Sequence, residues 1–573
     1  MAVAVGISLL NALTLSPALS ALIMRPHVQT ADGSRPRFPE RFAMAFNAAF
    51  RALLRRYERV VIAIVRHKWI AALLLISAFA GLGYLIQTTK TGFVPREDMG
   101  TIMMDVQTPP GTNLRATAKV MDEIDRRIRD IPQLKIYSKT TGSGMLSGQG
   151  SSSGMFIIRL KPCNERTGNN DDINSVIAEI YNRTSDITSA TILAFSQAMI
   201  PGYGASSGFE VHVQDQKGGT IEGLKEITQT FIDRLNARPE IARASTSFDT
   251  KYPQYLLEVD AIRCKRNGVS PSDVLSTLSG YIGGSYASNM NRFSKLYRVM
   301  VQASPEFRLD TDALSNMFVR NNTGEMTPIS QYLTLHRVYG AQSLARFNLF
   351  ASIAVNGEAA KGYSSGEAIN AIHEVAAEVL PTGYGYEFGG MSREESSAGS
   401  STLLIFVICI VFIYLILCAL YESLFIPIVI ILSVPFGLLG SFLFARMFGL
   451  ENNIYLQIGL LMLIGLLAKT AILLTEYASE RRKAGMTIGA AAIYAAKARL
   501  RAILMTSLTM IFGMLPLMFA TGVGANGNIS IGVGTVGGML VGTIALLFVV
   551  PVLFVVFRHI EERLMPKHHT NVQ

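Results

Sequence analysis

The sequence predicts an α-helical membrane bundle of seven spans joined to a large α+β domain outside the membrane. Charged residues make up only 16% of the 573 residues and hydrophobic residues 49%, a balance that is unusual for a chain that folds entirely in water. Several uncharged runs are long enough to cross a hydrocarbon core of about 30 Å. Residues 90–395 lie between two of these runs and are too many for a loop. A cytosolic enzyme is therefore nearly excluded.

The spans are read directly from the uncharged runs. The last two come from one stretch without charge, 502–557, which the polar, glycine-rich residues 521–530 divide. One span is interrupted by a single lysine, Lys469. The predicted spans are 1–24, 69–89, 396–421, 423–445, 452–475, 502–520 and 531–557.

Basic residues predict the orientation of the spans, because loops rich in Lys and Arg stay on the cytoplasmic side. Residues 25–68 hold ten of them and residues 476–501 hold six, whereas the short loops on the opposite side hold only Arg446. We therefore expect 25–68 to be a basic cytoplasmic linker with an amphipathic helix. Residues 558–573 form a cytoplasmic tail.

The first run is oriented in an unusual way. No basic residue precedes it and Arg25 follows it, which is the reverse of a secretory signal. This pattern favours the interpretation that the chain begins inside a larger protein. The alternative is that Met1 is a genuine start and the run is a poorly oriented anchor.

The first part of the extracytoplasmic region, residues 90–200, predicts one compact subdomain. Apolar residues alternate in its strands and follow helical spacing in between. The predicted order is strand, helix, strand, strand, helix, strand, which is the ferredoxin-like arrangement. The elements are strands at 101–107, 134–139, 155–160 and 190–195, and helices at 113–129 and 171–182.

Residues 201–395 predict a second subdomain of the same kind. It is expected to be interrupted by an insertion at about 280–360 and completed by the last helix and strand. The elements are strands at 209–213, 242–248, 255–259 and 384–388, and helices at 220–236 and 365–379.

The two middle strands of the first subdomain are separated by residues 140–154, which contain five glycines and seven Ser or Thr residues. Such a stretch has little side-chain reason to hold one conformation. It is interpreted either as a floppy surface loop, which the sequence favours, or as a mobile gate beside a cavity.

Methionines near the first subdomain leave a second ambiguity. Thioethers suit Cu(I) or Ag(I), but they also line greasy pockets or fill cores, and the latter interpretation is favoured. The sequence contains no convincing motif for a catalytic nucleophile, a nucleotide-binding loop or a metalloprotease. The methionines of the metal hypothesis are Met103, Met145, Met155 and Met199.

Lys469 is the clearest candidate for a functional residue, because a charge inside a membrane span is expensive and marks a site by default. It lies six residues from Thr475, about 9 Å along a helix, so snorkelling to the interface is an equal alternative. Thr506 at comparable depth in the next span, with Arg499 seven residues before it on the same helical face, favours a polar site. No Asp or Glu lies inside any span, so a carboxylate partner would have to come from elsewhere.

Several stretches together make the sequence similar to the C-terminal half of a resistance-nodulation-division (RND) multidrug efflux transporter of the hydrophobic and amphiphilic compound class. The similarity covers essentially the whole chain. The stretches are TGFVPREDMG (91–100), GGSYASNMNRF (283–293), GYSSGEAI (362–369), LPTGYGYEFGGMSREE (380–395), ALYESLFIP (419–427), GLLAKTAILLTEYA (465–478) and RLRAILMTSL (499–508).

This resemblance implies a secondary active transporter rather than an enzyme, with no cofactor and with the proton gradient as its energy source. It implies a multi-pass protein of the inner membrane of a Gram-negative bacterium, with the first run as the family's sixth span. The partners it implies are the missing N-terminal half, two further copies in a homotrimer, a periplasmic membrane-fusion adaptor, an outer-membrane channel and the lipid bilayer, with no nucleic acid. Lys469 and Thr506 correspond to the proton relay, Arg499 to a nearby arginine, and their paired aspartates lie outside this chain.

The resemblance also assigns the extracytoplasmic region. Residues 90–200 and 201–395 correspond to pore subdomains in the periplasm, and the insertion at about 280–360 to a docking subdomain. The glycine-rich stretch corresponds to a switch loop with Gly142, Ser143, Gly144, Gly148 and Gly150. The implied substrate-binding residues are Met145, Leu146, Ile157, Leu193 and Phe195.

Aliphatic and thioether side chains stand where well-studied members have phenylalanines, so aromatic stacking of substrates is not assured. The expected function is export of drugs, detergents or bile-salt-like molecules from the periplasm and membrane through an outer-membrane channel. Two alternatives stay open. One is a Cu(I)/Ag(I) exporter of the same superfamily, and the other is a membrane scaffold that retains the fold without transporting.

Overall fold

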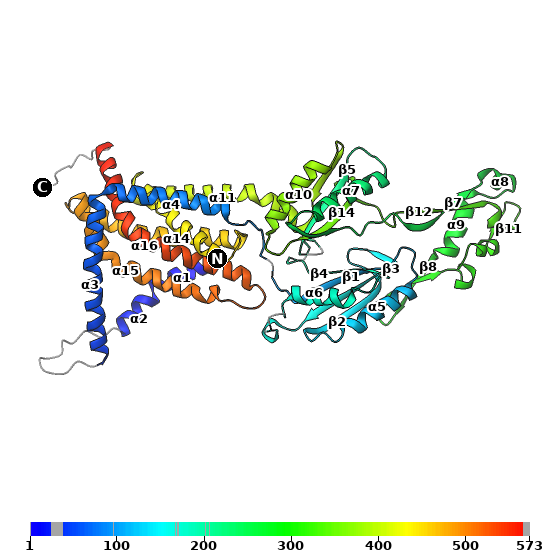
Figure 1. Ribbon diagram of the computed structural model, residues 1–573, viewed down its shortest axis with the longest axis horizontal. Helices are drawn as coiled ribbons and strands as arrows, with labels where there is room; N and C mark the ends of the chain where they lie inside the picture. Colours follow the sequence, from blue (N-terminus) through cyan, green and yellow to red (C-terminus); the bar gives the residue numbers. More distant parts are fainter. Residues whose placement is uncertain are drawn as a thin grey trace. The chain divides into compact units, whose positions relative to one another are not determined.

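A computed structural model describes residues 2–23, 38–95, 97–166, 168, 171–200, 202–204 and 207–564. The chain divides into two compact units, and each is described here by itself. Among the described residues, the regular elements of the first unit are all helices, whereas the second unit contains helices and the strands (Figure 1). The first comprises Met1–Ala72, Leu473–Ile503 and Leu547–Gln573, and the second Leu73–Ile472 and Leu504–Leu546.

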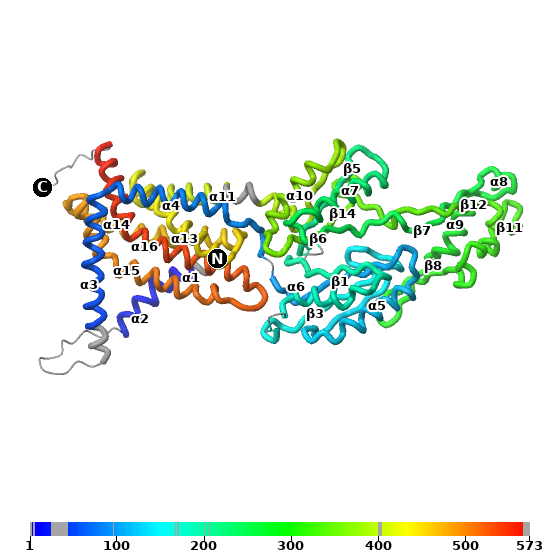
Figure 2. The backbone as a smooth tube through the Cα atoms, viewed as in Figure 1, coloured from blue at the N-terminus to red at the C-terminus, as the bar shows by residue number. Residues whose placement is uncertain are grey.

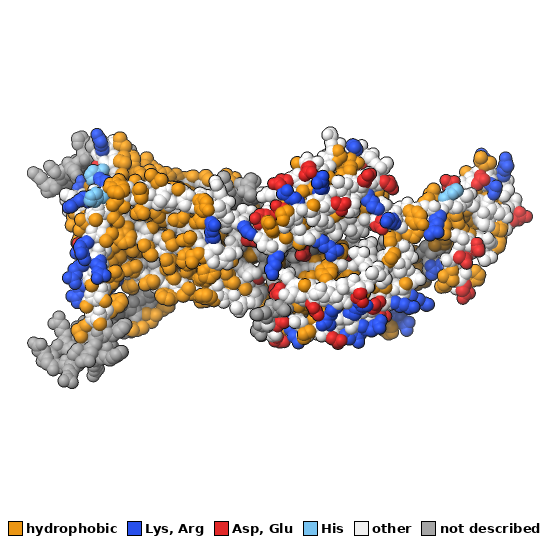
Figure 3. All heavy atoms as spheres, in the orientation of Figure 1, with side chains coloured by type: hydrophobic (Ala, Val, Ile, Leu, Met, Phe, Trp, Pro, Cys, Tyr) orange, Lys and Arg blue, Asp and Glu red, His pale blue; other side chains and the backbone are white. Residues whose placement is uncertain are grey.

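Seven helical stretches among the described residues are long and apolar enough to cross a membrane. Many large apolar side chains on them are exposed, and Figure 3 shows hydrophobic side chains gathered over the helices on the face drawn. An outward surface of this kind is stable only against lipid or a partner. The stretches are Gly6–Ile23, Lys68–Thr88, Leu404–Tyr421, Ile426–Met447, Ile454–Lys483, Ile488–Met518 and Ala525–Leu564.

Two of the predicted spans are broken in the structure. The first run forms α1 (Ala2–Leu13) and α2 (Leu15–Ile23), and the hydroxyl of Thr14 between them donates to the carbonyl of Leu10 at 2.7 Å. The run 423–445 forms α12 (Ile426–Ile431) and α13 (Val434–Met447). Pro435 at the start of α13 explains this break, since it has no backbone N–H to continue the preceding helix.

The other span helices are longer than the uncharged runs. Helix α14 (Ile454–Lys483) continues past residue 475, and α15 (Ile488–Met518) begins well before residue 502. Helix α16 (Ala525–Leu564) begins inside 521–530, which was expected to be a loop. The expectation of a loop over all of 521–530 was wrong, because polar residues can continue a helix beyond its apolar part. The bounds of the spans themselves stay a prediction. The remaining two are α4 (Lys68–Thr88) and α11 (Gly390–Tyr421).

The basic segment after the first run contains one long helix, α3 (Phe38–Arg66), while residues 24–37 lie outside the described residues. Within the first unit, Tyr57 and Val61 of α3 are buried, and the Tyr57 hydroxyl donates to the carbonyl of Leu547 at 2.7 Å. Its apolar stripe therefore packs on the bundle while its arginines remain at the surface.

Glycines allow the helices of the second unit to approach closely. A Cβ on Gly440 of α13 would lie 2.6 Å from the carbonyl oxygen of Gly537 in α16, and one on Gly437 would lie 2.0 Å from Leu467 of α14. Small residues at such crossings are typical of packing between membrane helices.

The first sheet has the strand order β2-β3-β1-β4, with antiparallel neighbours throughout. Ile102, Met104 and Val106 of β1 point to one face, which helices α5 and α6 cover to form a core with Met121 and Ile180. Side chains of Asn113 and Asp172 cap the two helices. The elements are β1 (Thr101–Gln107), α5 (Leu114–Ile128), β2 (Leu134–Ser143), β3 (Gln149–Leu160), α6 (Ile173–Thr184) and β4 (Thr191–Ser196).

The prediction of a loop over 140–154 was wrong for most of its length. Strand β2 continues to Ser143 and β3 begins at Gln149, so the turn is confined to residues 144–148, called the hairpin tip below. The N–H of Gly144 donates to the carbonyl of Gly148 at 2.8 Å across this turn. Thr and Ser side chains fit a pleated surface, and strand pairing supplies the order that the side chains alone do not.

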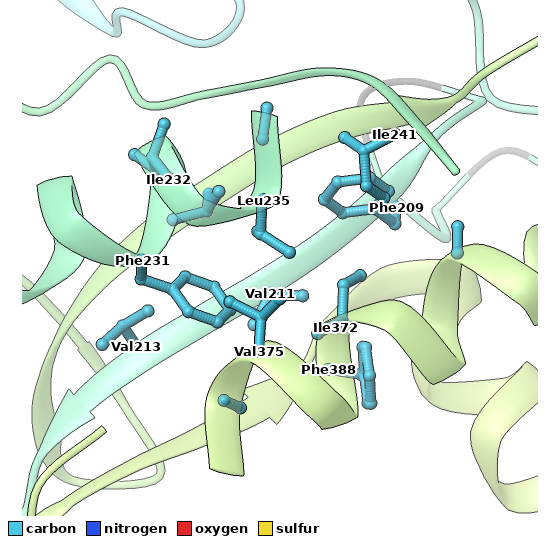
Figure 4. Packing of buried hydrophobic residues seen from close by; sticks show 14 of the residues in the cluster. Phe209, Val211, Val213, Phe231, Ile232, Leu235, Ile241, Ile372, Val375 and Phe388 are labelled. Carbon is cyan, nitrogen blue, oxygen red and sulfur yellow. The ribbon is translucent and has the colours of Figure 1, made fainter. Parts of the chain in front are cut away.

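The second sheet has the order β13-β14-β5-β15, with β6 also paired to β14. Figure 4 shows Val211 and Val213 of β5 packed against Phe231 and Val375 of the covering helices. A capping box at Ser364 starts the second helix. The elements are β5 (Phe209–Asp215), α7 (Ile221–Asn236), β6 (Ile241–Ser245), β13 (Ala345–Phe347), β14 (Phe350–Ala359), α10 (Ser365–Val379) and β15 (Tyr384–Phe388).

The insertion begins earlier than expected. Strand β7 (Tyr252–Val259), expected in the second sheet, instead pairs with β12 (Leu333–Gly340), and Figure 2 shows the two side by side. The place beside β5 belongs to β14, whose Ile353 and Val355 are buried, whereas most side chains of β7 are not. The stronger apolar alternation of β14 explains why it is the partner.

The inserted region has a core of its own. Tyr332, Val274 and Ile329 are buried in it together with Cys264. Its elements are α8 (Ala261–Arg266), α9 (Pro271–Ile282), β8 (Ser285–Arg292), β9 (Lys295–Val301), β10 (Phe318–Arg320) and β11 (Met326–Pro328).

Candidate functional site

The face of the first sheet opposite its helices brings together residues that the sequence analysis singled out. Met103 of β1 lies opposite Ile157 of β3 and Phe195 of β4. Because paired residues in antiparallel strands point to the same side, these side chains form one continuous surface, which we call the second face. It contains Met103, Asp105, Met155, Ile157, Leu193 and Phe195.

Asp105 lies in the middle of the second face, opposite Met155 on one side and Leu193 on the other. Its side chain is only 2% exposed. The backbone N–H groups of Met145 and Leu146 donate to its Oδ1 at 2.6 and 3.3 Å. Burial raises the pKa of the Asp105 carboxyl above its usual range, and hydrogen bonds from the hairpin tip counteract this only in part.

The hairpin tip is held at two further points. The Ser247 hydroxyl donates to the carbonyl of Leu146 at 2.9 Å, and the Gln342 side-chain amide donates to the carbonyl of Gln149 at 3.0 Å. Both donors come from chain segments beyond the first subdomain. The tip is therefore attached both to the second face and to the neighbouring subdomain.

Glycine is required at the point of closest approach. A Cβ on Gly144 would lie 2.5 Å from Oδ1 of Asp105, and one on Gly150 would lie 2.3 Å from Nε2 of Gln342. Gly142 and Gly148 have φ of +94° and +74°, values that side chains disfavour. Ser143 is the last residue of β2.

Met145 and Leu146 were predicted to contact substrate, and the structure separates their roles. Their backbones both bond to Asp105, but the Met145 side chain is 43% exposed, whereas Leu146 is half-buried. Asp105 itself was missed by the sequence analysis. The signal was present, because it is the only charged residue in the otherwise uncharged strand 101–107.

A separate cavity of about 800 Å³ lies in the second unit, between the α+β region and the ends of its helices. Met199, Tyr203 and Met391 give it apolar surface, while charged residues stand at its wall. Lys90 donates to the carbonyl of Gly362. The charged residues are Lys90, Lys361, Glu395, Arg446 and Glu451.

Hydroxyl groups hydrogen-bond to two of these charged side chains. The guanidinium of Arg446 donates to the Thr88 hydroxyl at 3.2 Å, and Glu395 accepts from the Ser365 hydroxyl at 2.6 Å. An apolar cavity with a few placed polar groups is the usual form of a small-molecule site. Of the sequence-predicted site residues, only Met199 lines it.

The four methionines of the metal hypothesis do not form one cluster. Met103 and Met155 share the second face, but the Met145 side chain is exposed on the hairpin tip. The sulfur of Met199 accepts the backbone N–H of Glu97 at 3.4 Å and lines the other cavity.

Lys469 lies midway along α14 with an exposed side chain, although both of its neighbours, Ala468 and Thr470, are buried. It forms no ion pair with any residue that the structure describes. Thr506 of α15 is half-buried, and the adjacent Ser507 accepts a hydrogen bond of 3.1 Å from Thr543 of α16. Each of α14, α15 and α16 thus carries a polar group within its apolar part.

Arg499 belongs to the first unit, whereas Lys469 and Thr506 belong to the second. Its guanidinium lies over the ring of Tyr477, 4.6 Å from the ring centroid. This cation–π contact gives Arg499 a local structural role within the first unit. Whether it shares a site with Lys469 stays a prediction.

The sequence of the chain is similar to that of known transporters. Residues 1–558 match the AcrB/AcrD/AcrF family. The chain is 35% identical over 557 residues to the multidrug/solvent efflux pump membrane transporter MepB of Pseudomonas putida, covering 96% of this chain and 52% of that protein. It is 34% identical over 564 residues to the multidrug export protein AcrF of Escherichia coli, covering 97% and 54% respectively. The chain therefore spans about half the length of the curated relatives it matches.

Proposed function

Since the chain belongs to the AcrB/AcrD/AcrF family of RND efflux transporters, we propose that it supplies about half of a proton-driven pump that exports hydrophobic and amphiphilic compounds. The observation on which this depends is Lys469, an exposed cation and the only charged residue of the predicted span 452–475. A charge within a membrane span is energetically costly and usually marks a functional site.

Proton coupling is proposed to occur at Lys469 and Thr506. An ammonium in a medium of low dielectric constant must meet a carboxylate or lose its proton. The uncharged runs that predict the spans contain no Asp or Glu, so the carboxylates are proposed to come from a second transporter half. Protonation of those carboxylates from one side of the membrane would release Lys469, and loss of the protons to the other side would restore the ion pair. No cofactor takes part, and the proton gradient supplies the energy.

The substrate path is proposed to include the cavity of about 800 Å³ and the second face. Both offer thioether, aliphatic and aromatic side chains, which suit compounds of varied shape. The strand order β2-β3-β1-β4, with a helix after the first and third strands, supports two ferredoxin-like pore subdomains with the insertion as a docking subdomain.

The proposed assembly is a homotrimer in the inner membrane, with residues 90–395 in the periplasm. It would work with a membrane-fusion adaptor and an outer-membrane channel. The seven apolar helical stretches and the basic residues on one side of them support this orientation.

Expression in an efflux-deficient Gram-negative strain tests the proposal. This chain co-expressed with a family N-terminal half is expected to restore resistance to amphiphilic drugs, and the chain alone is not. Co-expression with the Lys469→Ala variant should remove the resistance while leaving the protein level unchanged. Resistance from the chain alone, or full resistance with Lys469→Ala, would contradict it.

The alternatives predict other results. The curated relatives are named for multidrug and solvent efflux, and this favours an amphiphile exporter over a Cu(I)/Ag(I) exporter. A membrane scaffold without transport would tolerate the Lys469→Ala change with no loss of its phenotype. Silver tolerance that falls on replacement of Met103 and Met155, with drug resistance unchanged, would favour the metal exporter.

A further inference from the structure

Asp105 is a buried carboxylate whose cost is offset in an unusual way. It forms no ion pair within the part of the chain that the structure describes, and its hydrogen bonds come from the hairpin tip, from the backbone of Met145 and Leu146 and from Ser147. An ionised group at 2% exposure is unfavourable unless donors surround it. The donors here belong to a turn, and a turn is the part of a hairpin that moves most easily.

Charged groups on the neighbouring strands are directed elsewhere. The ammonium of Lys139 on β2 lies against Asp122, and the Tyr137 hydroxyl against Asp125, both of α5 on the opposite face. Arg159 on β3 lies on the same side as Asp105, but it is opposite Thr101 at the strand end, four residues along β3 from Met155, and is exposed. Strand β4 and the hairpin tip contain no titratable side chain, and Asp249 of the following connection pairs with Lys225 at 3.3 Å.

Opening of the tip would therefore uncover a carboxylate without a cation. It would be flanked by Met103, Met155 and Leu193, with Arg159 as the charged residue at the end of the same side of β3. Such a surface attracts a hydrophobic molecule that has a positive charge and rejects one with a negative charge, because the low dielectric strengthens both effects.

We propose that Asp105 is a specificity-determining residue that holds the hairpin tip closed over the second face and, when the tip opens, binds hydrophobic organic cations. The cation and the hydrogen-bond donors of the tip compete for the same carboxylate. The cation is favoured when the tip opens, because its attraction to the carboxylate is strong in a medium of low dielectric constant and the released amides can bond to water. This proposal rests on the proposed function for its link to transport, but not for binding itself.

Binding by the purified chain is the first test, with tetraphenylphosphonium and tetraphenylborate as probes of equal shape and opposite charge. The chain should bind the cation, and Asp105→Asn should weaken that binding roughly tenfold, the equivalent of about 1.4 kcal/mol. Tetraphenylborate should bind no more weakly to the variant than to the original chain. Asp130→Asn, at an exposed position of the same subdomain, is the matched control and should change neither.

Hydrogen exchange separates specificity from a merely structural role. Tetraphenylphosphonium should speed exchange of the Met145 and Leu146 amides in the original chain, while the amides of the β1–β3 ladder stay protected. In Asp105→Asn these two amides should exchange faster without any probe and respond little to the cation. Equal loss of both probes, or exchange that ignores the cation, would overturn the proposal.

Transport then distinguishes the two levels of the argument. In the co-expressed pump, Asp105→Asn should reduce efflux of the cation and spare a neutral amphiphile. Absence of efflux in the original pump would refute the proposed function and leave the binding results to decide the role of Asp105. Efflux of cation and neutral compound reduced to the same extent would refute the specificity role.

Discussion

The backbone N–H of Met145 donates to the carboxylate of Asp105 at 2.6 Å, a contact that joins the tip of one hairpin to the middle of a neighbouring strand. Leu146 adds a second, longer bond to the same oxygen. The residue whose side chain was expected to meet substrate thus contributes its backbone, and the side chain remains largely exposed. The tip is thus bonded through its backbone to one buried carboxyl group.

Enlarging Gly144 should loosen the tip. A methyl group in Gly144→Ala would lie 2.5 Å from Oδ1 of Asp105, so either the tip or the carboxylate must shift. We expect faster exchange of the Met145 and Leu146 amides by hydrogen exchange mass spectrometry. Ser143→Ala, one residue away at the end of β2, is the control, and equal protection in the two variants would contradict this expectation.

Removing the charge of Asp98 should destabilise the first subdomain. The Arg166 guanidinium, 3% exposed in its side chain, donates to both carboxylate oxygens of Asp98 at 2.8 and 3.0 Å. Asp98→Asn leaves that buried cation without its partner. Because the Asp98 side chain is 28% exposed, we expect a loss of only about 1–3 kcal/mol in unfolding free energy, measured by denaturant titration. Asp130→Asn should leave it unchanged.

The same pair predicts a pH dependence. Burial opposes ionisation of Asp98, but Arg166 and the backbone N–H groups of Gly100 and Ile173 together outweigh it and hold the pKa of the carboxyl below its ordinary value of 3.8. A lowered folded-state pKa contributes stability that is present above 3.8 and lost as the pH falls through the lower value. Thermal denaturation between about pH 6 and about pH 2 should show less acid destabilisation in Asp98→Asn than in the original chain.

Burial of Asp105 predicts the opposite sign. Its folded-state pKa is raised above the ordinary 3.8, so its stabilising contribution is complete below 3.8 and disappears as the pH rises through the raised value. The original chain should therefore lose stability as the pH rises above 3.8, and Asp105→Asn should not show this loss. A stability profile for Asp105→Asn that parallels the original chain in this range would contradict the assignment.

Truncation of a core side chain gives a reference for these effects. Phe156 is fully buried beneath α5 and α6, and Phe156→Ala should cost about 3–5 kcal/mol. Ile136→Ala, at a side chain that is 64% exposed, should cost much less. Melting temperatures of the two purified variants check the difference, and similar temperatures would argue against this core.

The sequence predicted the first subdomain well, because its elements are local. Alternation in β1 and the capping residues Asn113 and Asp172 are visible in short windows. The boundaries of the insertion were not predictable in this way, since β14 is selected by its fit to β5, a partner more than a hundred residues away. Strand structure in 140–154 likewise depends on pairing rather than on composition.

The candidate site divides along the same line. Residue type alone identified Lys469, because a charge inside an apolar run is conspicuous. Ile157, Leu193 and Phe195 were named by resemblance, and their shared face follows from strand register. The role of Asp105 becomes visible only in the folded hairpin, where its carboxylate accepts a hydrogen bond from a residue forty positions away in the chain.

The ribbon of β7 and β12 makes the inserted region separable from the rest. The chain leaves along Tyr252–Val259 and returns along Leu333–Gly340 in register, so departure and re-entry points are about one strand spacing apart, roughly 5 Å. The residues between Val259 and Leu333 therefore do not affect the alignment of β5 with β14. We expect that this inserted region can be exchanged between homologous chains, because its two ends are already paired.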